Sequence, residues 1–222
     1  MSGLLRRIFG GDPDDDREYS IRLVFALGNP GGEYAHNRRN VGFWVVNRLA
    51  KKHGADFGQK TGTYALAEAE IAGRRIAIAK TRTFNNESGN AVMALIRKLK
   101  LDDAREMMTV CDHLDLPVGK VRIRRSGGGG GQKGMADIIR KTGTDAFPRA
   151  RIGIGRPVVR GEPSHDPEHV AAWVLSDPDP DERRILDAAV ERAIEAIECA
   201  IADGVEAAMN RYNRDGAGPA DA

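Results

Sequence analysis

One local pattern restricts the fold more than any other: an apolar, β-branched run over residues 21–27 stops at the segment 28–32, Gly-Asn-Pro-Gly-Gly. A run of this kind predicts a buried strand, and the glycine- and proline-rich segment predicts a tight turn. Apolar residues then recur at helical spacing, at Val41, Trp44, Val45 and Leu49. A strand followed at once by an amphipathic helix requires the helix to pack on a sheet, which indicates an α/β fold.

The same alternation continues along the chain. Further strands are expected at 64–71, 75–80, 107–111, 118–125 and 150–154, the first two joined as a hairpin through Ala72-Gly73. Further helices are expected over 90–99, around Met135, Ile138 and Ile139, and from the capping Asp179 to Ile201. We therefore expect a single α/β domain over residues 21–213, with a mixed, twisted sheet flanked by helices. For residues 1–20 and 214–222 we expect a flexible acidic extension and a flexible tail, because they have little to bury.

Composition excludes several classes of protein. The 222 residues include 34 Lys and Arg against 32 Asp and Glu, which argues against a globally basic nucleic-acid binder but leaves room for a local basic patch. The two cysteines, Cys111 and Cys199, are too few for a disulfide framework or a cysteine-rich zinc site, so a reducing cytoplasm fits best. No apolar run approaches the roughly 18 residues that a membrane helix needs, and the N-terminus lacks the apolar core of a secretory signal.

Three segments could carry chemistry, and each has a plain structural alternative. The loop 28–32 follows a strand, where open α/β sheets bind ligands, but it also reads as a tight turn. Asp112 ends the strand 107–111 and is either an orienting acid or a cap. The five glycines 127–131 leave backbone amides free to approach a phosphate or a planar substrate end, or they form a flexible linker.

Two further segments concern basic and metal-binding side chains. Lys120, Arg122 and Arg124 share one face of the strand expected at 118–125, which suits a phosphate backbone or an ordinary solvated surface. His165 and His169 are four residues apart, as metal ligands on a helix are. Pro167 between them argues against a helix, and therefore against a metal site.

At these residues the chain resembles the bacterial peptidyl-tRNA hydrolases. The similarity begins at 27–34, Leu-Gly-Asn-Pro-Gly-Gly-Glu-Tyr, and continues in order through 83–89, 112–117, 127–139 and 151–157. It implies a domain that binds the acceptor end of peptidyl-tRNA and hydrolyses the ester between the peptide and the terminal ribose, which rescues tRNA from aborted translation. The resemblance also implies no metal and no cofactor, and a cytoplasmic monomer whose partner is tRNA or peptidyl-tRNA.

The resemblance assigns roles to individual residues. In the family a histidine acts as general base on water, an aspartate orients the histidine, and two asparagines position the water and the substrate carbonyl. The aspartate corresponds to Asp112 and the first asparagine to Asn86. Substrate-binding positions of the family correspond to Asn29, Tyr34 and Asn85. Positions that bind tRNA phosphates correspond to Arg122, Arg124 and Arg151.

Two catalytic positions depart from the family pattern. Where the family reads Thr-Arg-His-Asn, residues 37–40 read Asn-Arg-Arg-Asn, so Arg39 stands at the histidine position. Where the family reads His-Asn-Gly, the chain has Gln132-Lys133-Gly134, so Lys133 stands at the second asparagine position. An arginine keeps its proton near neutral pH and cannot act as a general base, but its guanidinium can pair with Asp112.

Two functions therefore stay open: an esterase with weakened or altered catalysis, and a tRNA- or RNA-binding relative that no longer cleaves. Lys133 could replace the base only if it releases its proton. His113 is expected to face away from Asp112 along an extended strand, and it could reach the site only if the strand has already ended there. In either case we expect Arg39 and Asp112 within ion-pair distance, with Asn86 beside the same cleft.

Overall fold

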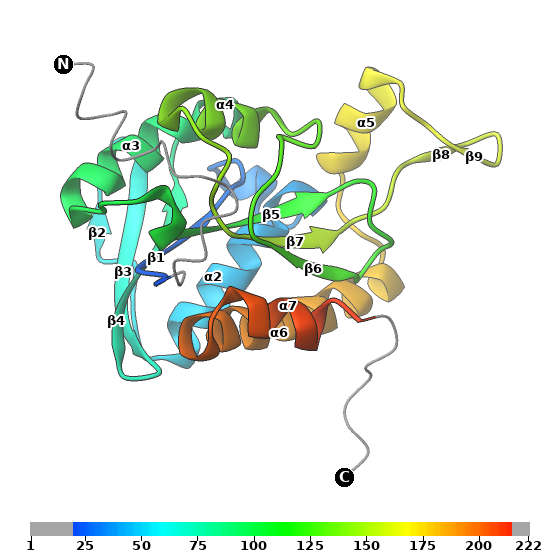
Figure 1. The fold of residues 1–222 in the computed structure, drawn as a ribbon. Coiled ribbons are helices and arrows are strands. Elements are labelled where there is room, and N and C mark those ends of the chain that lie inside the picture. The colour runs from blue at the N-terminus through cyan, green and yellow to red at the C-terminus, as the bar shows by residue number, and fades with distance from the viewer. Residues whose placement is uncertain (1–19, 215–222) are drawn as a thin grey trace, which may run out of the picture.

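Helices cover both faces of one sheet in the computed structural model, which describes residues 20–214 (Figure 1). The sheet has the strand order β2-β3-β4-β1-β5-β7-β6. Its strands are β1 (Leu23–Ala26), β2 (Gln59–Lys60), β3 (Tyr64–Ile71), β4 (Arg74–Thr81), β5 (Met107–His113), β6 (Val121–Arg124) and β7 (Arg149–Gly153). The central strands β4, β1, β5 and β7 are parallel, and β2, β3 and β6 add antiparallel pairs at the two edges. The predicted mixed α/β sheet is confirmed.

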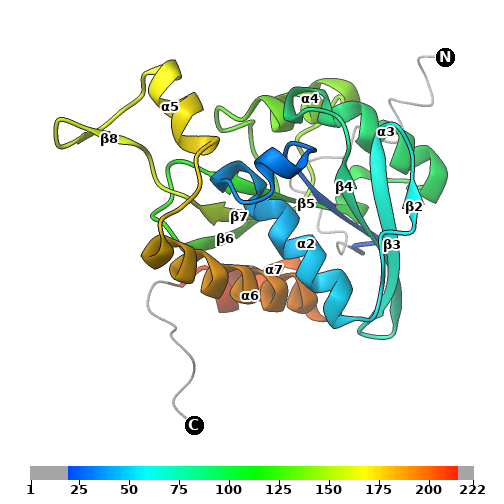
Figure 2. The same cartoon turned by 180° about the vertical axis from the view of Figure 1, so that it is seen from behind.

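The helices divide between the two faces (Figures 1 and 2). They are α2 (Val41–Lys52), α3 (Ser88–Leu99), α4 (Lys133–Thr142), α5 (Pro167–Val174), α6 (Pro180–Asp203) and α7 (Val205–Tyr212). One core lies between the sheet and α2 and α6, and a second lies between the sheet and α3 and α4. All four residues of β1 are buried because the strand is covered on both faces, which explains its unbroken apolar sequence.

Short elements complete the chain. They are the 3₁₀ turns η1 (Gly32–Tyr34), η2 (Arg38–Asn40), η3 (Asn85–Glu87) and η4 (Ala104–Glu106), and the small hairpin β8 (Val158–Val159) and β9 (Glu162–Pro163). The segments after β1, β4 and β5 meet at one edge of the sheet because these three strands are parallel neighbours. That edge is where α/β sheets place their ligands.

Two interpretations of the sequence need correction. The strand expected at 118–125 is only Val121–Arg124, because the amide of Lys120 donates to the carbonyl of Pro117 in a turn. Lys120 therefore does not share a strand face with Arg122 and Arg124. Pro167 begins the unpredicted helix α5 instead of preventing it, since the first helical position needs no amide hydrogen.

The C-terminal region also differs from the single helix expected from Asp179. Gly204, at φ +92°, separates α6 from α7. None of the helices within residues 20–214 is both long and apolar enough to span a membrane. Apart from residues 20 and 214, the predicted flexible termini lie outside the described part of the chain.

Candidate active site

A cleft of about 670 Å³ opens beyond the carboxyl ends of β1, β4 and β5. It is bordered by five of the residues singled out in the sequence: Asn29, Arg39, Asn85, Asn86 and Lys133. Helix α5 contributes another wall. Asp112 lies in a smaller adjoining cavity of about 40 Å³, which Arg39 also borders. The fold thus gathers residues from six segments of the chain at one place.

Asp112 is held by two donors from different elements. The Nη1 of Arg39, on η2, lies 2.6 Å from Asp112 Oδ2, and the side chains are only 14% and 2% exposed. The Nε2 of Gln132, the residue before α4, donates to Asp112 Oδ1 at 2.6 Å. The expected proximity of Arg39 and Asp112 is therefore observed, and both carboxylate oxygens already accept a hydrogen bond.

Asn29 is fixed by a network of amide groups. Its backbone N–H donates to Asn40 Oδ1 at 2.7 Å, and Asn40 Nδ2 donates back to the Asn29 carbonyl at 2.9 Å. Its side-chain Oδ1 accepts the backbone N–H of Asn85 at 3.0 Å. The loop after β1 is consequently both a rigid turn and a wall of the cleft, so the two interpretations of this segment are compatible.

The remaining predicted site residues differ in their placement. Asn85 is buried at 8% exposure, whereas Asn86 and Lys133 are exposed at the rim. Within residues 20–214, the side chain of Lys133 makes no hydrogen bond or ion pair, and the side chain of Asn86 makes no hydrogen bond. Tyr34, on η1, does not line the cleft.

Basic residues gather on β6 and β7 next to the glycine loop. The antiparallel register places Arg122 opposite Arg151 and Arg124 opposite Arg149. Arg149 is completely buried and donates to the carbonyls of Gly128 at 2.7 Å and Asp145 at 3.1 Å. Burial, and after it the positive charge of Arg151, lower the pKa of Arg149 to about 10. The glycine segment is therefore anchored over this basic face and is not a free linker.

The sequence interpretation did not assign a role to Arg149 or Gln132. The place of Arg149 could have been predicted from the sequence, because it is two residues from Arg151 and so shares its strand face. The contact of Gln132 with Asp112 could not, since it depends on how the glycine loop folds back.

His113 reaches the site because its strand ends there. It is the last residue of β5 and borders the same small cavity as Asp112, because the cavity lies at the strand end, where both faces are accessible. Its Nδ1 accepts the backbone N–H of Asp115 at 3.2 Å. Burial lowers the pKa of His113, and the nearby Arg151 lowers it further, so the imidazole is neutral at pH 7. With Nδ1 accepting, the neutral ring carries its proton on Nε2 and is a donor there.

The segment containing His165 and His169 has a structural role. Asp166 caps α5 by accepting from the amides of Glu168 and His169. Among residues 20–214 there is no group of three or more His, Cys, Asp and Glu side chains that could hold a metal ion.

Comparison with known proteins decides the family. A family model for peptidyl-tRNA hydrolase matches residues 23–219. The chain belongs to the peptidyl-tRNA hydrolase family. It is 42% identical over 191 residues to the peptidyl-tRNA hydrolase of Chloroflexus aggregans, covering 86% of this chain and 98% of that one. It is 39% identical over 193 residues to the enzyme of Syntrophomonas wolfei, covering 87% and 100%.

Solved peptidyl-tRNA hydrolases share the fold. The crystal structure from Acinetobacter baumannii superposes with a TM-score of 0.81 at 31% identity, covering 89% of this chain and 96% of that one. A peptidyl-tRNA hydrolase in complex with N-propanol gives a TM-score of 0.82 at 30% identity, covering 91% and 99%. The matches extend over the whole α/β domain, so the domain has the architecture of a peptidyl-tRNA hydrolase.

Proposed function

We propose that the chain binds the acceptor end of peptidyl-tRNA in the cleft and hydrolyses the peptide–ribose ester slowly. The observation that carries this proposal is the ion pair between Arg39 and Asp112 at 2.6 Å. By the family resemblance, Arg39 stands where a histidine would act as general base and Asp112 is its orienting partner. The arrangement keeps the orienting carboxylate but puts beside it a group that stays protonated near neutral pH.

The size of the catalytic loss follows from the missing proton acceptor. A positioned general base contributes about 10²–10⁴ in rate. Besides the two replaced positions, Asn86 borders the cleft, and Asn29 and Asn85 are connected by a hydrogen bond. Binding and positioning of the ester are therefore expected to survive better than its cleavage.

In the cell, we propose that the chain works as a cytoplasmic monomer in translation, on tRNA released from stalled ribosomes. Arg122, Arg124 and Arg151 are the proposed contacts for tRNA phosphates, supported by their shared position on β6 and β7. Phosphate contacts of this kind supply affinity and orientation without reading sequence. No metal or cofactor is part of the proposal.

One observation favours a second candidate, a tRNA-binding relative that no longer cleaves. Both oxygens of Asp112 are engaged, by Arg39 and by Gln132, so the carboxylate has no direct role left in proton transfer. Among described residues, the side chain of Lys133 also lines the cleft without a partner, so an incoming ester would meet it without a neutralising ion pair.

The test is a comparison of binding and cleavage with one substrate, an N-acetylated aminoacyl-tRNA. We expect wild-type protein to bind it and to release the acetylated amino acid slowly in single-turnover conditions. The Asp112→Asn variant, purified in the same way, is the control for any contaminating hydrolase and is expected to lose the residual cleavage. Binding without cleavage above this control favours the second candidate, and absence of binding contradicts both.

A further inference from the structure

Helix α5 forms a wall of the cleft but is only partly packed on the domain: Val174 belongs to the core, and Val170 and Trp173 are partly buried against it. Four of its residues, Pro167, Val170, Ala171 and Val174, face the cleft, and only Val174 is buried. In Figures 1 and 2 it lies at one end of the molecule, beside the β8–β9 hairpin. Its main contact with another element is with η2. Because a helix of eight residues is marginal on its own, specific contacts must determine its position.

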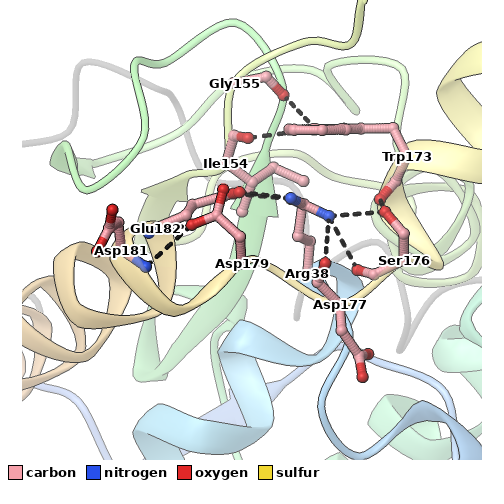
Figure 3. Close-up of polar contacts among 9 residues, drawn as sticks. All are labelled: Arg38, Ile154, Gly155, Trp173, Ser176, Asp177, Asp179, Asp181 and Glu182. Atoms are coloured by element: carbon pink, nitrogen blue, oxygen red, sulfur yellow. Dashed lines mark hydrogen bonds and ion pairs between the residues drawn. The ribbon is translucent and has the colours of Figure 1, made fainter.

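Arg38 on η2 supplies these contacts (Figure 3). The residue is only 4% exposed, and its guanidinium stacks on the Trp173 ring, 3.6 Å from the ring centre. Its Nη1 donates to the hydroxyl of Ser176 at 2.6 Å and to the carbonyls of Ser176 and Asp177, both at 3.1 Å. A single side chain therefore holds the last turn of α5 and the segment that follows it.

The same guanidinium reaches the first turn of α6. Its Nε donates to Glu182 Oε1 at 2.7 Å, and its Nη2 pairs with Glu182 Oε2. The Nε1 of Trp173 donates in turn to the carbonyls of Ile154, at 3.2 Å, and Gly155, at 3.0 Å. Arg38 and Trp173 thus tie α5 to three parts of the domain: η2, the start of α6 and the segment after β7.

We propose that Arg38 is a positioning residue that holds α5 as a wall of the cleft and thereby sets the affinity for the acceptor end of peptidyl-tRNA. The inference rests on the proposed function for the identity of the ligand, but the attachment of α5 can be tested without it. Arg38 is adjacent to Arg39, so the turn that presents the ion pair to Asp112 is the same turn that holds the wall. The planar guanidinium of Arg38 is essential, because the single ammonium of a lysine cannot bind Glu182, Ser176 and the indole face together.

The experiment measures amide hydrogen exchange and binding of an amide-linked, uncleavable peptidyl-tRNA analogue. In the Arg38→Gln variant we expect exchange over 167–174 to accelerate roughly ten- to hundredfold, with α2 and α3 unchanged, because local opening reports local attachment. The dissociation constant of the analogue is expected to rise about tenfold. Arg48→Gln is the matched control, because it removes an arginine that pairs with Asp187 and Glu191 on α6 and does not line the cleft.

Two conservative variants keep the inference testable if Arg38→Gln does not fold. Arg38→Lys retains the charge near Glu182 and is expected to loosen α5. Trp173→Leu is expected to lose protection from exchange over 167–174. Trp173→Phe retains a ring for stacking and is expected to keep part of that protection. Unchanged exchange over 167–174 in Arg38→Lys overturns the inference. Faster exchange with unchanged affinity overturns the link to binding, and failure of the wild-type protein to bind the analogue contradicts the proposed function instead.

Discussion

At the scale of single residues, the environment of β5 determines which groups can exchange protons. Asp112 is buried between two donors, Arg39 and Gln132, and a pair with so little exposure is only weakly screened by salt. His113, next in sequence, is half-buried beside Arg151. The strand end therefore places an ion-paired carboxylate next to an imidazole whose pKa is lowered.

The titration of His113 gives the first prediction. Burial is the larger cause of its lowered pKa and Arg151 the next, so Arg151→Gln should raise the pKa of His113 without removing the burial. The pKa of His113 in the folded chain is below the ordinary 6.5, so the unfolded chain binds more protons at pH values between these two pKa values. Stability is therefore lost as pH falls through 6.5, and the loss should be smaller in the variant. Proton NMR of the imidazole measures the midpoint. The Arg124→Gln variant is the control and is expected to keep the wild-type midpoint. If Arg151→Gln also keeps the wild-type midpoint, Arg151 does not lower the pKa of His113.

The residue scale also shows what sequence could and could not predict. The approach of Arg39 to Asp112 was predictable, because the family resemblance aligns both positions with a contacting pair. The contact of Gln132 was not, since it depends on a glycine loop whose path is fixed by the buried Arg149. His113 was expected to reach the site only if its strand ended there, and strand alternation alone does not predict that β5 ends at His113 beside a cavity.

At the scale of elements, one close approach determines how α2 sits on the sheet. A Cβ added at Gly42 would lie 2.7 Å from the carbonyl oxygen of Val110 and 2.9 Å from that of Leu27. Both neighbours are backbone atoms of the sheet region, which cannot move aside as a flexible side chain would. The missing side chain at this position lets the first turn of α2 approach the ends of β1 and β5, beside the cleft.

Gly42→Ala therefore changes the free energy of unfolding through two opposing effects, helix propensity and steric crowding. Helix propensity alone favours alanine by about 1 kcal/mol, whereas forcing a methyl group into packed backbone costs about 1–3 kcal/mol. We expect net destabilisation, read as a lower urea midpoint with an unchanged slope. Gly58→Ala is the control, because a Cβ there meets nothing within 4 Å and is expected to leave the midpoint unchanged or slightly higher. A Gly42→Ala protein as stable as the wild type would contradict this account of α2.

Elements with strong periodicity were predicted, and those held by isolated contacts were missed. Helix α6 was found from its Asp179 cap and apolar stripe, both of which the structure contains. Helix α5 was missed because Pro167 was interpreted as a breaker, although five of its eight residues are apolar and only Val174 is buried. Its position depends on Arg38 and Trp173, a contact between distant parts of the chain that no local pattern reports.

At the scale of the whole molecule, a net charge of only +2 coexists with a concentrated basic face. The α/β class could be predicted because alternating strands and helices restrict the architecture to helices on a sheet. The strand order could not, since it depends on pairings between segments such as β1 and β5, which are far apart in sequence. The order matters for function, because it brings β6 and β7 to the edge beside the glycine loop.

The basic face yields a prediction about salt. Changing Arg122, Arg124 and Arg151 together to alanine should weaken tRNA binding and flatten its salt dependence. Each lost phosphate contact lowers the slope of log K against log salt by about 0.7–0.9, so the triple variant should lose roughly two units or more. The control replaces Arg74, Arg75 and Arg184, three exposed arginines away from this face, and so makes the same change in net charge. A triple variant with the wild-type slope would mean that these arginines do not contact phosphates.

The central claim is that Arg39 and Lys133 weaken cleavage while the rest of the site remains intact. It is tested most directly by single-turnover ester cleavage in four proteins: wild type, Arg39→His, Lys133→Asn and the double variant. Arg39→His alone should gain little, because the introduced imidazole shares the cleft with Lys133, and a nearby cation lowers the pKa of an imidazole and its strength as a base. The double variant should exceed the product of the two single effects, since the base and its positioning groups act as a unit, and the total gain should reach about 10²–10⁴. A wild-type rate equal to that of the double variant would contradict the account.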